Sequence, residues 1–186
     1  MTTVVRITSP LDDRVIDKLV AGTQVLISGV VYTARDAAHR RIVEALDRGE
    51  KPPFDLKGQT IYYSGPTPSR PGAVIGSIGP TTAGRVDVYT PRLLAEGIKG
   101  MIGKGGRSVA VREAIRKYRA FYFVATGGAG ALLSKFVERA ELIAYEDLGT
   151  EAVRRLVIKD LPAIVADDLY GSDLYELEQA KYRREG

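Results

Sequence analysis

The amino-acid sequence predicts an α/β domain. Short segments rich in β-forming apolar residues alternate with segments that carry a helical repeat, which is typical of strands and helices built around one sheet. Three glycine-rich turns, at residues 79–84, 103–106 and 126–130, join these segments or lie beside such a junction. Since helices begin near such turns, we expect an anion site at the carboxyl ends of the strands, where backbone N–H groups are free.

The composition is that of an ordinary globular protein. The 186 residues are 45% hydrophobic and 27% charged, which favours a single domain over residues 1–186 with a core of its own. The net charge is +4, the charges are interspersed, and no basic stripe with stacking aromatic residues is evident, so we expect no nucleic-acid partner. No segment has the pattern of a signal peptide or a membrane span, and we therefore expect a cytoplasmic protein without a membrane partner.

The cysteine and histidine counts exclude several kinds of site. The chain has no cysteine, and so it offers no disulfide, no thiolate nucleophile and no cysteine-ligated metal. Its single histidine, His39, excludes a histidine-rich metal site. We expect no metal or cofactor to be ligated by this chain.

The first part of the chain is predicted to alternate between strands and helices. Residues 3–7, 23–31 and 59–63 have the character of strands. Residues 11–20 have a short helical repeat, and a second helix is expected from 36 to about 48. This alternation supports the α/β class.

The start of the second helix carries a capping pattern. Thr33-x-x-Asp36 predicts a capping box, in which two side chains bind backbone N–H groups at the helix start. Gly49 and Pro52 follow the helix and are expected to end it. The stripe that should face the core consists of Ala38, Ile42, Ala45 and Leu46.

The second part of the chain is again regular. Helices are expected at 89–96, 109–118, 131–136 and 172–182, and strands at 100–102, 120–125, 137–145 and 153–159. Ser108 is the predicted N-cap of the helix at 109–118. Residues 161–166 are apolar but do not distinguish helix from strand, and residues 172–186 form the expected C-terminal helix and tail.

The loop at 62–89 is the strongest functional signal from the residues alone. It lacks a regular repeat, yet it has apolar residues and little charge, which favours an ordered functional loop over a disordered one. Within it, Thr81 and Thr82 precede Arg85, and two hydroxyls with a cation suit an oxygen-rich anion. The alternative is a rigid Gly/Pro loop that only packs on the domain.

The other glycine-rich turns do not match nucleotide-binding motifs. The turn at 103–108 lacks the phosphate-loop spacing, and the turn at 126–130 lacks the Gly-x-Gly-x-x-Gly spacing of dinucleotide folds. Arg35 and His39 lie four residues apart and therefore share one face of the expected helix.

Five short motifs together resemble one family. They occur in the order Thr-Ala-Arg-Asp-Ala-Ala-His at 33–39, Gly-Pro-Thr-Pro at 65–68, Gly-Pro-Thr-Thr-Ala-Gly-Arg at 79–85, Lys-Gly-Met-Ile-Gly-Lys-Gly at 99–105 and Thr-Gly-Gly at 126–128. In this order and spacing the chain resembles the beta subunit, or C-terminal domain, of class I iron–sulfur fumarate hydratases and of the related tartrate dehydratases. The resemblance extends over residues 11–175.

The resemblance implies a fold, a partner and a reaction. The fold would be a swivelling β/β/α domain with a mixed sheet, docked on an alpha subunit. The alpha subunit would carry the four-iron four-sulfur cluster, which the lack of cysteine in this chain fits. The reaction would be the reversible hydration of fumarate to malate, or the dehydration of tartrate to oxaloacetate, and the sequence does not choose between them. The exposed docking face also makes a homo-oligomer of the isolated subunit an expectation.

The resemblance also implies roles for individual residues. Arg35, Arg85 and Lys104 would bind the substrate carboxylates, a role that suits the planar fork of arginine and the compact charge of lysine. Thr81 would be the catalytic base or would only hydrogen-bond the substrate, and a base role requires activation of its hydroxyl. The other implied residues are Thr82, beside the substrate or in the turn, and His39, which orients the substrate or Arg35 or is structural.

Two readings of another class stay open at this point. The chain could be a basic phosphate- or nucleic-acid-binding module, or a purely structural or regulatory swivel domain. Convergence of the separate cations at one place would favour the enzyme subunit over both.

Overall fold

The strands form a mixed sheet that closes on itself. The computed structural model describes residues 4–12 and 18–183. The sheet has the strand order β1-β2-β3-β4-β5-β7-β6, and β2 pairs additionally with β7. The strands are β1 (Val5–Ser9), β2 (Gln24–Thr33), β3 (Thr60–Tyr62), β4 (Gly100–Gly103), β5 (Phe121–Val124), β6 (Val137–Ala144) and β7 (Val153–Asp167).

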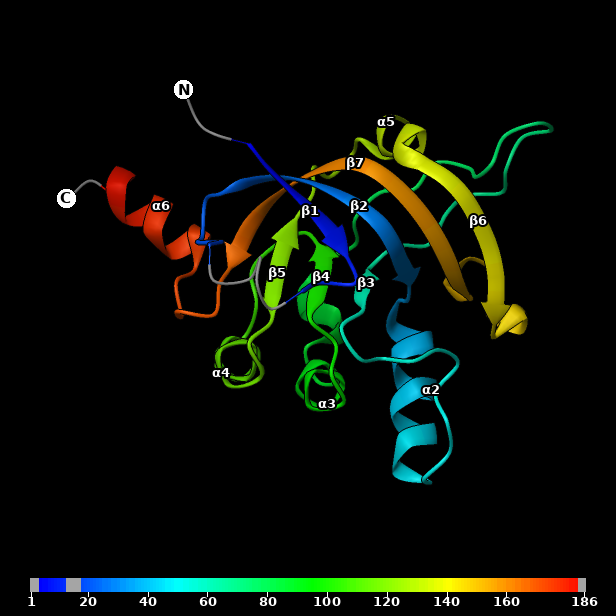
Figure 1. Cartoon of the computed structure of the whole chain (residues 1–186), viewed down its shortest axis with the longest axis horizontal. Helices are drawn as coiled ribbons and strands as arrows, with labels where there is room; N and C mark the ends of the chain where they lie inside the picture. The colour runs from blue at the N-terminus through cyan, green and yellow to red at the C-terminus, as the bar shows by residue number, and fades with distance from the viewer. Residues whose placement is uncertain (1–3, 13–17, 184–186) are drawn as a thin grey trace.

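The direction of the strands places five carboxyl ends at one edge. Strands β1 to β5 pair in parallel, and β7 pairs antiparallel with β2, β5 and β6. Because β7 bonds both β5 and β2, strands β2, β3, β4, β5 and β7 form a closed, barrel-like ring, with β1 and β6 outside it (Figure 1). The predicted α/β class is confirmed, with the mixed sheet that the family resemblance implied.

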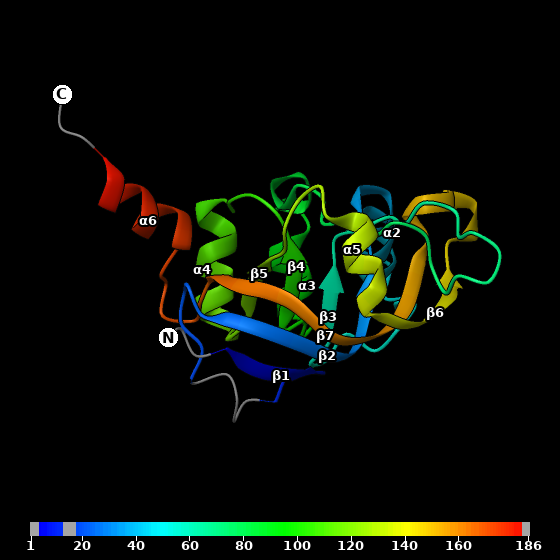
Figure 2. The same cartoon turned by 90° about the horizontal axis from the view of Figure 1, so that it is seen from above.

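Helices cover one side of the ring. Figure 1 shows α2 (Asp36–Asp47), α3 (Thr90–Ala95) and α4 (Val109–Tyr118) together on one side of the strands, while α6 (Leu174–Tyr182) lies at the end of the molecule. Figure 2 shows β1 on the side of the strands opposite these three helices. The remaining short elements are α5 (Gly130–Leu133) and the 3-10 turns η1 (Ala83–Val86), η2 (Ser134–Phe136) and η3 (Glu146–Glu151).

Two apolar cores follow from this arrangement. One lies between the helices and the sheet and includes Ile42, Leu93, Ile115 and Met101. The other includes buried residues of all seven strands, among them Ile27, Ile102, Phe123 and Val165. Both faces of β3, β4 and β5 are therefore buried, which explains why these short strands are almost uniformly apolar.

Most of the predicted elements are present, and two differ from expectation. The ambiguous segment 161–166 continues the strand at 153–159, so that β7 runs unbroken for 15 residues. A bulge at Lys159 and Asp160 shifts the register against β2, Asp160 has a positive φ of 51°, and its N–H donates to Ser28 Oγ. The helix expected at 131–136 is a short α5 followed by η2.

Two further expectations concern the segment at 11–20 and membrane spans. Residues 13–17 of the helix expected at 11–20 lie outside the described ranges. Among residues 4–12 and 18–183, no helix has the length and apolar character needed to cross a membrane.

Candidate functional site

The motif residues gather at the carboxyl edge of four neighbouring strands. Arg35 lies two residues after β2, and Lys104 directly follows β4. Residues 63–65 continue β3, and residues 126–128 follow β5. Since β2, β3, β4 and β5 are adjacent and parallel, the turns after them lie side by side at one edge of the sheet.

Thr81 and Thr82 join this edge as an inserted strand-like segment. The Thr81 N–H donates to the Tyr63 carbonyl at 2.7 Å, and the Thr81 hydroxyl donates to the same carbonyl at 2.8 Å. On its other side, the Thr81 carbonyl accepts from the Lys104 N–H at 3.1 Å, and Thr82 forms a parallel bridge with Lys104. The long loop thus returns between the extensions of β3 and β4 and brings Thr81, Thr82 and Lys104 into contact.

Arg35 lies at the start of α2 in a confined position. Its Nη2 is 3.4 Å from Glu151 Oε1, its side chain is 22% exposed, and its Nε is buried without a hydrogen-bond partner among the described residues. A Cβ at Gly65 would lie 3.0 Å from Arg35 Cδ and 2.7 Å from the Thr150 carbonyl oxygen. Only glycine at position 65 lets the arginine side chain pass this close to the backbone.

The predicted capping box is wrong. Thr33 ends strand β2, where its hydroxyl donates to the Ala152 carbonyl and accepts from the Arg154 N–H. The N-cap is Arg35, which makes no side-chain cap, and the Ala37 N–H instead donates to Glu151 Oε2 at 2.9 Å. The Thr33 hydroxyl is bound within the sheet and does not reach the helix start. Glu151 of η3, 114 residues after Ala37, provides the cap instead.

Asp36 binds Arg85 rather than the backbone. Arg85 Nε donates to Asp36 Oδ1 at 2.9 Å, with the side chains 56% and 33% exposed. Among the described residues the terminal Nη groups of Arg85 have no hydrogen-bond partner, so the outer edge of its guanidinium is available to an anion.

His39 lies beneath Arg35. The side chain is fully buried, and Nδ1 is 2.8 Å from the Arg35 carbonyl oxygen, so Nδ1 carries the proton and donates. Burial lowers the pKa of His39 from 6.5 to about 4, so the ring is neutral near pH 7. The ring meets Tyr63 edge-on at 5.3 Å between centroids, and Nε2 has no partner among the described residues.

Lys104 is exposed at the same edge. A Cβ at Gly127 would lie 3.2 Å from Lys104 Cδ, so the lysine side chain passes directly over the turn that follows β5. The turn at Gly105 is held by two tyrosines, since Tyr122 OH donates to the Gly105 carbonyl at 2.8 Å and the Gly105 N–H donates to Tyr175 OH at 3.2 Å.

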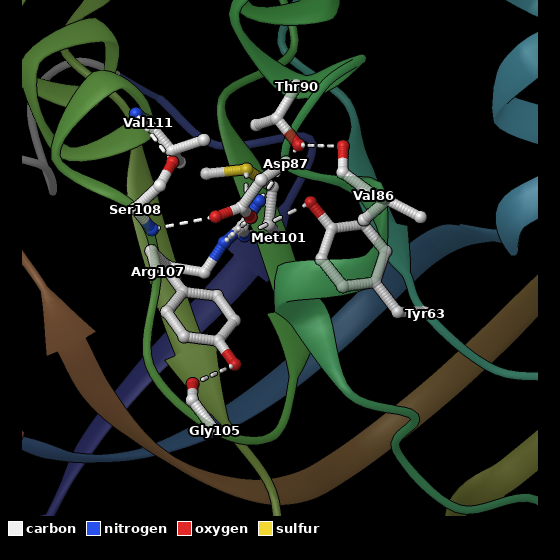
Figure 3. A network of polar contacts seen from close by, with 10 residues as sticks. Tyr63, Val86, Asp87, Thr90, Met101, Gly105, Arg107, Ser108 and Val111 are labelled. Carbon is white, nitrogen blue, oxygen red and sulfur yellow. Dashed lines mark hydrogen bonds and ion pairs between the residues drawn. The ribbon is translucent and has the colours of Figure 1, made fainter.

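Arg107 anchors this turn from within the protein, which the sequence did not predict. Figure 3 shows its guanidinium between Asp87, Tyr63 and Thr90. Nε donates to Asp87 Oδ1 at 2.7 Å, Nη1 to Tyr63 OH at 3.2 Å and Nη2 to Thr90 Oγ1 at 2.8 Å. The Arg107 side chain is fully buried, so this cation supports the site and does not face a ligand.

The same network reaches the segment that carries Thr81 and Arg85. Asp87 follows η1, and its Oδ2 accepts from the Ser108 N–H at 2.6 Å. Ser108 is the N-cap of α4, as predicted, and its side chain accepts from the Val111 N–H. The turn after β4 and the loop after β3 are therefore bound to each other below the site.

The arrangement suits a small molecule with two negative groups. Arg35 and Lys104 follow β2 and β4 at one edge of the sheet, and Arg85 is bound to Asp36 beside Arg35. The backbone of Thr81 and Thr82 runs between Tyr63, which follows β3, and Lys104. Arginine forks bind carboxylates with two parallel hydrogen bonds, which adds geometric specificity.

The comparisons with known proteins identify the family of the chain. A family model described as "Fumarase C-terminus" matches residues 2–178 of the chain. The chain belongs to this fumarase C-terminal family. The resemblance of the five sequence motifs is thereby confirmed.

The relatives in this family differ in their overall length. The chain is 38% identical over 160 residues to an aerobic class I fumarate hydratase of Salmonella typhimurium, covering 85% of this chain and 28% of the relative. It is 39% identical over 156 residues to fumarate hydratase 2 of Leishmania major, covering 83% of this chain and 28% of the relative. The chain thus spans about 28% of the length of these relatives.

One relative matches over nearly its whole length. A candidate L(+)-tartrate dehydratase beta subunit of Methanocaldococcus jannaschii is 38% identical over 172 residues, which cover 89% of this chain and 88% of the relative. The family therefore includes both long chains and separate subunits of about this size.

Proposed function

We propose that this chain is the beta subunit of an iron–sulfur-dependent hydro-lyase that reversibly hydrates fumarate to malate. The observation that carries the proposal is that Arg35, Arg85 and Lys104 belong to segments at the same carboxyl edge of β2, β3 and β4. Family membership and the fumarate hydratases among the relatives support it.

In this proposal the three cations hold the dicarboxylate. The Nη groups of Arg85 bind one carboxylate of the substrate, because Asp36 accepts only from Nε. Arg35, whose buried Nε is without a partner among the described residues, and Lys104 bind the remaining anionic oxygens. Fixing both ends of the substrate sets the position of the carbon atoms between them, which lowers the entropic part of the barrier.

Thr81 lies in the middle of this arrangement and is our proposed contact to the reacting carbon. Its hydroxyl donates to a backbone carbonyl, which orients the oxygen lone pairs away from Tyr63. The carbonyl does not accept a proton, so a base role for Thr81 needs activation by the nearby cations or by a group on the partner. A role in hydrogen-bonding the substrate needs no activation.

The donor set of this chain does not fit an iron–sulfur cluster. The chain has no cysteine, and residues 4–12 and 18–183 contain no group of three or more side chains arranged to hold a metal. We therefore propose that the cluster is ligated by a separate alpha subunit and that this chain supplies only substrate-binding groups.

Dehydration of tartrate to oxaloacetate is the second candidate function. It is favoured by the beta subunit from Methanocaldococcus jannaschii, whose length this chain matches. Tartrate also carries two carboxylates, so the same cations would hold it, and its additional hydroxyl requires a further polar contact.

Co-expression with a candidate alpha chain from the same organism tests the proposal. We expect the anaerobically purified complex to consume fumarate, measured by its ultraviolet absorbance, and each separate chain to be inactive. Activity on tartrate in place of fumarate would select the second candidate. Hydratase activity of this chain alone, free of iron, or an iron–sulfur complex inactive on both substrates, would refute the proposal.

A further inference from the structure

We propose that Asp36, in the first turn of α2, and Glu151, which contacts the start of α2 from η3, are positioning residues that set the orientation and spacing of the two substrate-binding arginines. This inference rests on the proposed function, because it assigns how Arg35 and Arg85 are held for a dicarboxylate. Neither acidic residue needs to touch the substrate.

Asp36 holds Arg85 by one atom. The carboxylate accepts from Nε at 2.9 Å and contacts the guanidinium on one side only. Arg85 belongs to η1, a single 3-10 turn, and its side chain is 56% exposed, so little else restricts its rotation. An ion pair this exposed contributes little to folding stability, and its main effect is on the direction of the guanidinium.

Glu151 has two contacts at the same helix start. Oε2 accepts from the Ala37 N–H at 2.9 Å, and Oε1 lies 3.4 Å from Arg35 Nη2. The carboxylate therefore supplies the cap that Arg35 does not provide and offsets a cation placed at the positive end of the helix. It also keeps the Arg35 side chain against Gly65.

The two contacts tie both arginines to consecutive residues. Arg35 projects from the N-cap itself, and Arg85 is bound by the next residue, although the two arginines lie 50 positions apart in the sequence. The separation between the two guanidinium groups thus depends on two consecutive backbone positions, Arg35 and Asp36. Such a device fixes the distance at which two carboxylates are bound.

Substitutions at Asp36 in the complex with the alpha chain test this inference. Asp36→Asn keeps an oxygen that accepts from Arg85 Nε and removes only the charge, whereas Asp36→Ala removes the contact. We expect Asp36→Ala to lower kcat/KM by roughly tenfold or more, mainly through KM, because a misplaced binding group weakens substrate alignment. Asp36→Asn should stay close to wild type. The same measurement on Glu151→Gln, which retains an acceptor for the Ala37 N–H but loses the charge, should show a raised KM with only a small loss of Tm.

Asp47→Ala is the matched control. Asp47 ends the same helix, lies 3.8 Å from Arg92 in another exposed ion pair, and its replacement should leave kcat/KM unchanged. A double-mutant cycle separates positioning from a general structural effect. If Asp36 acts through Arg85, Asp36→Ala should cause no further loss of kcat/KM in an Arg85→Ala background.

Three results would overturn the inference while leaving the proposed function intact. These are an Asp36→Ala complex as active as Asp47→Ala, equal losses in Asp36→Ala and Asp36→Asn, and additive losses with Arg85→Ala. A wild-type complex inactive on both fumarate and tartrate would instead overturn the proposed function, and the inference with it.

Discussion

Replacing Arg107 by methionine should strongly destabilise the chain. The guanidinium binds Asp87, Tyr63 OH and Thr90 Oγ1, and it lies over the Tyr63 and Tyr122 rings at 5.3 and 4.8 Å. Methionine fills part of the volume but forms none of these hydrogen bonds. The Asp87 carboxylate, 14% exposed, then keeps the Ser108 N–H as its donor and loses its cation.

The expected loss follows from the burial of this pair. Removing one partner of a buried ion pair costs about 3–5 kcal/mol, because the other charge stays desolvated and unpaired. We therefore expect Arg107→Met to reduce the free energy of unfolding by about 3 kcal/mol or more. Since domains are stable by only about 5–15 kcal/mol, this is a large fraction of the total.

Urea unfolding followed by circular dichroism measures the effect. Arg92→Met is the control, because Arg92 forms only exposed ion pairs with Asp47 and Glu96, and we expect a loss of at most about 1 kcal/mol. Asp87→Asn should cost less in the Arg107→Met background than alone, as expected of a coupled pair. If Arg107→Met were no more destabilising than Arg92→Met, the network would not be the support that we describe.

Three further predictions concern the site. Burial lowers the pKa of His39 to about 4, so between pH 6.5 and 4 the unfolded chain binds a proton that the native chain does not. As pH falls through this range, the free energy of unfolding should decrease by about 3 kcal/mol. Burial raises the pKa of Asp167 to about 7, so this group makes stability increase as pH falls from 7 to 4, opposite to the effect of His39. The test is therefore the difference in unfolding free energy between wild type and His39→Asn, measured in urea at each pH. Parallel curves for the two proteins would contradict the prediction. Gly65→Ala should raise KM in the complex, because a Cβ there meets both Arg35 and the Thr150 carbonyl. Gly72→Ala is the control, because it has nothing near its Cβ and a strained φ of 79°, so it should lower stability but leave KM unchanged in the same assay. Thr81→Val should lower kcat by about 10²-fold or more if the hydroxyl is the base, and a smaller loss with a raised KM would assign it to substrate binding.

The fold class was predictable because its signals are local. Strands β2, β4 and β5 and helices α2, α3 and α4 each have an apolar repeat and a turn at their ends. The continuation of β7 through residues 161–166 was not predictable, since the bulge at Asp160 takes its partner, Ser28, from β2. The failed capping box at Thr33 has the same cause, because long-range pairing with Ala152 and Arg154 outweighed a local pattern.

The sequence motifs contain the proposed ligand-facing residues but not all of the residues that support them. Arg35, Arg85 and Lys104 belong to motifs that can be read in sequence. Glu151 and Arg107 lie in ordinary charged segments, and only the fold brings them to α2 and to Asp87. The sequence pattern predicts a capping role for Asp36, and it gives no signal for the hydrogen bond that this side chain accepts from Arg85.

The closed ring of strands has a consequence for affinity. Because β7 is bonded to both β2 and β5, the strand ends that carry Arg35 and Lys104 do not spread apart without breaking a ladder. The entropy cost of ordering these backbone segments is therefore part of folding, and it does not reduce the affinity for a ligand. If the site is shared with an alpha subunit, as we propose, an opening that admits substrate would be a rigid-body movement of this chain against that subunit, with the backbone of this edge unchanged.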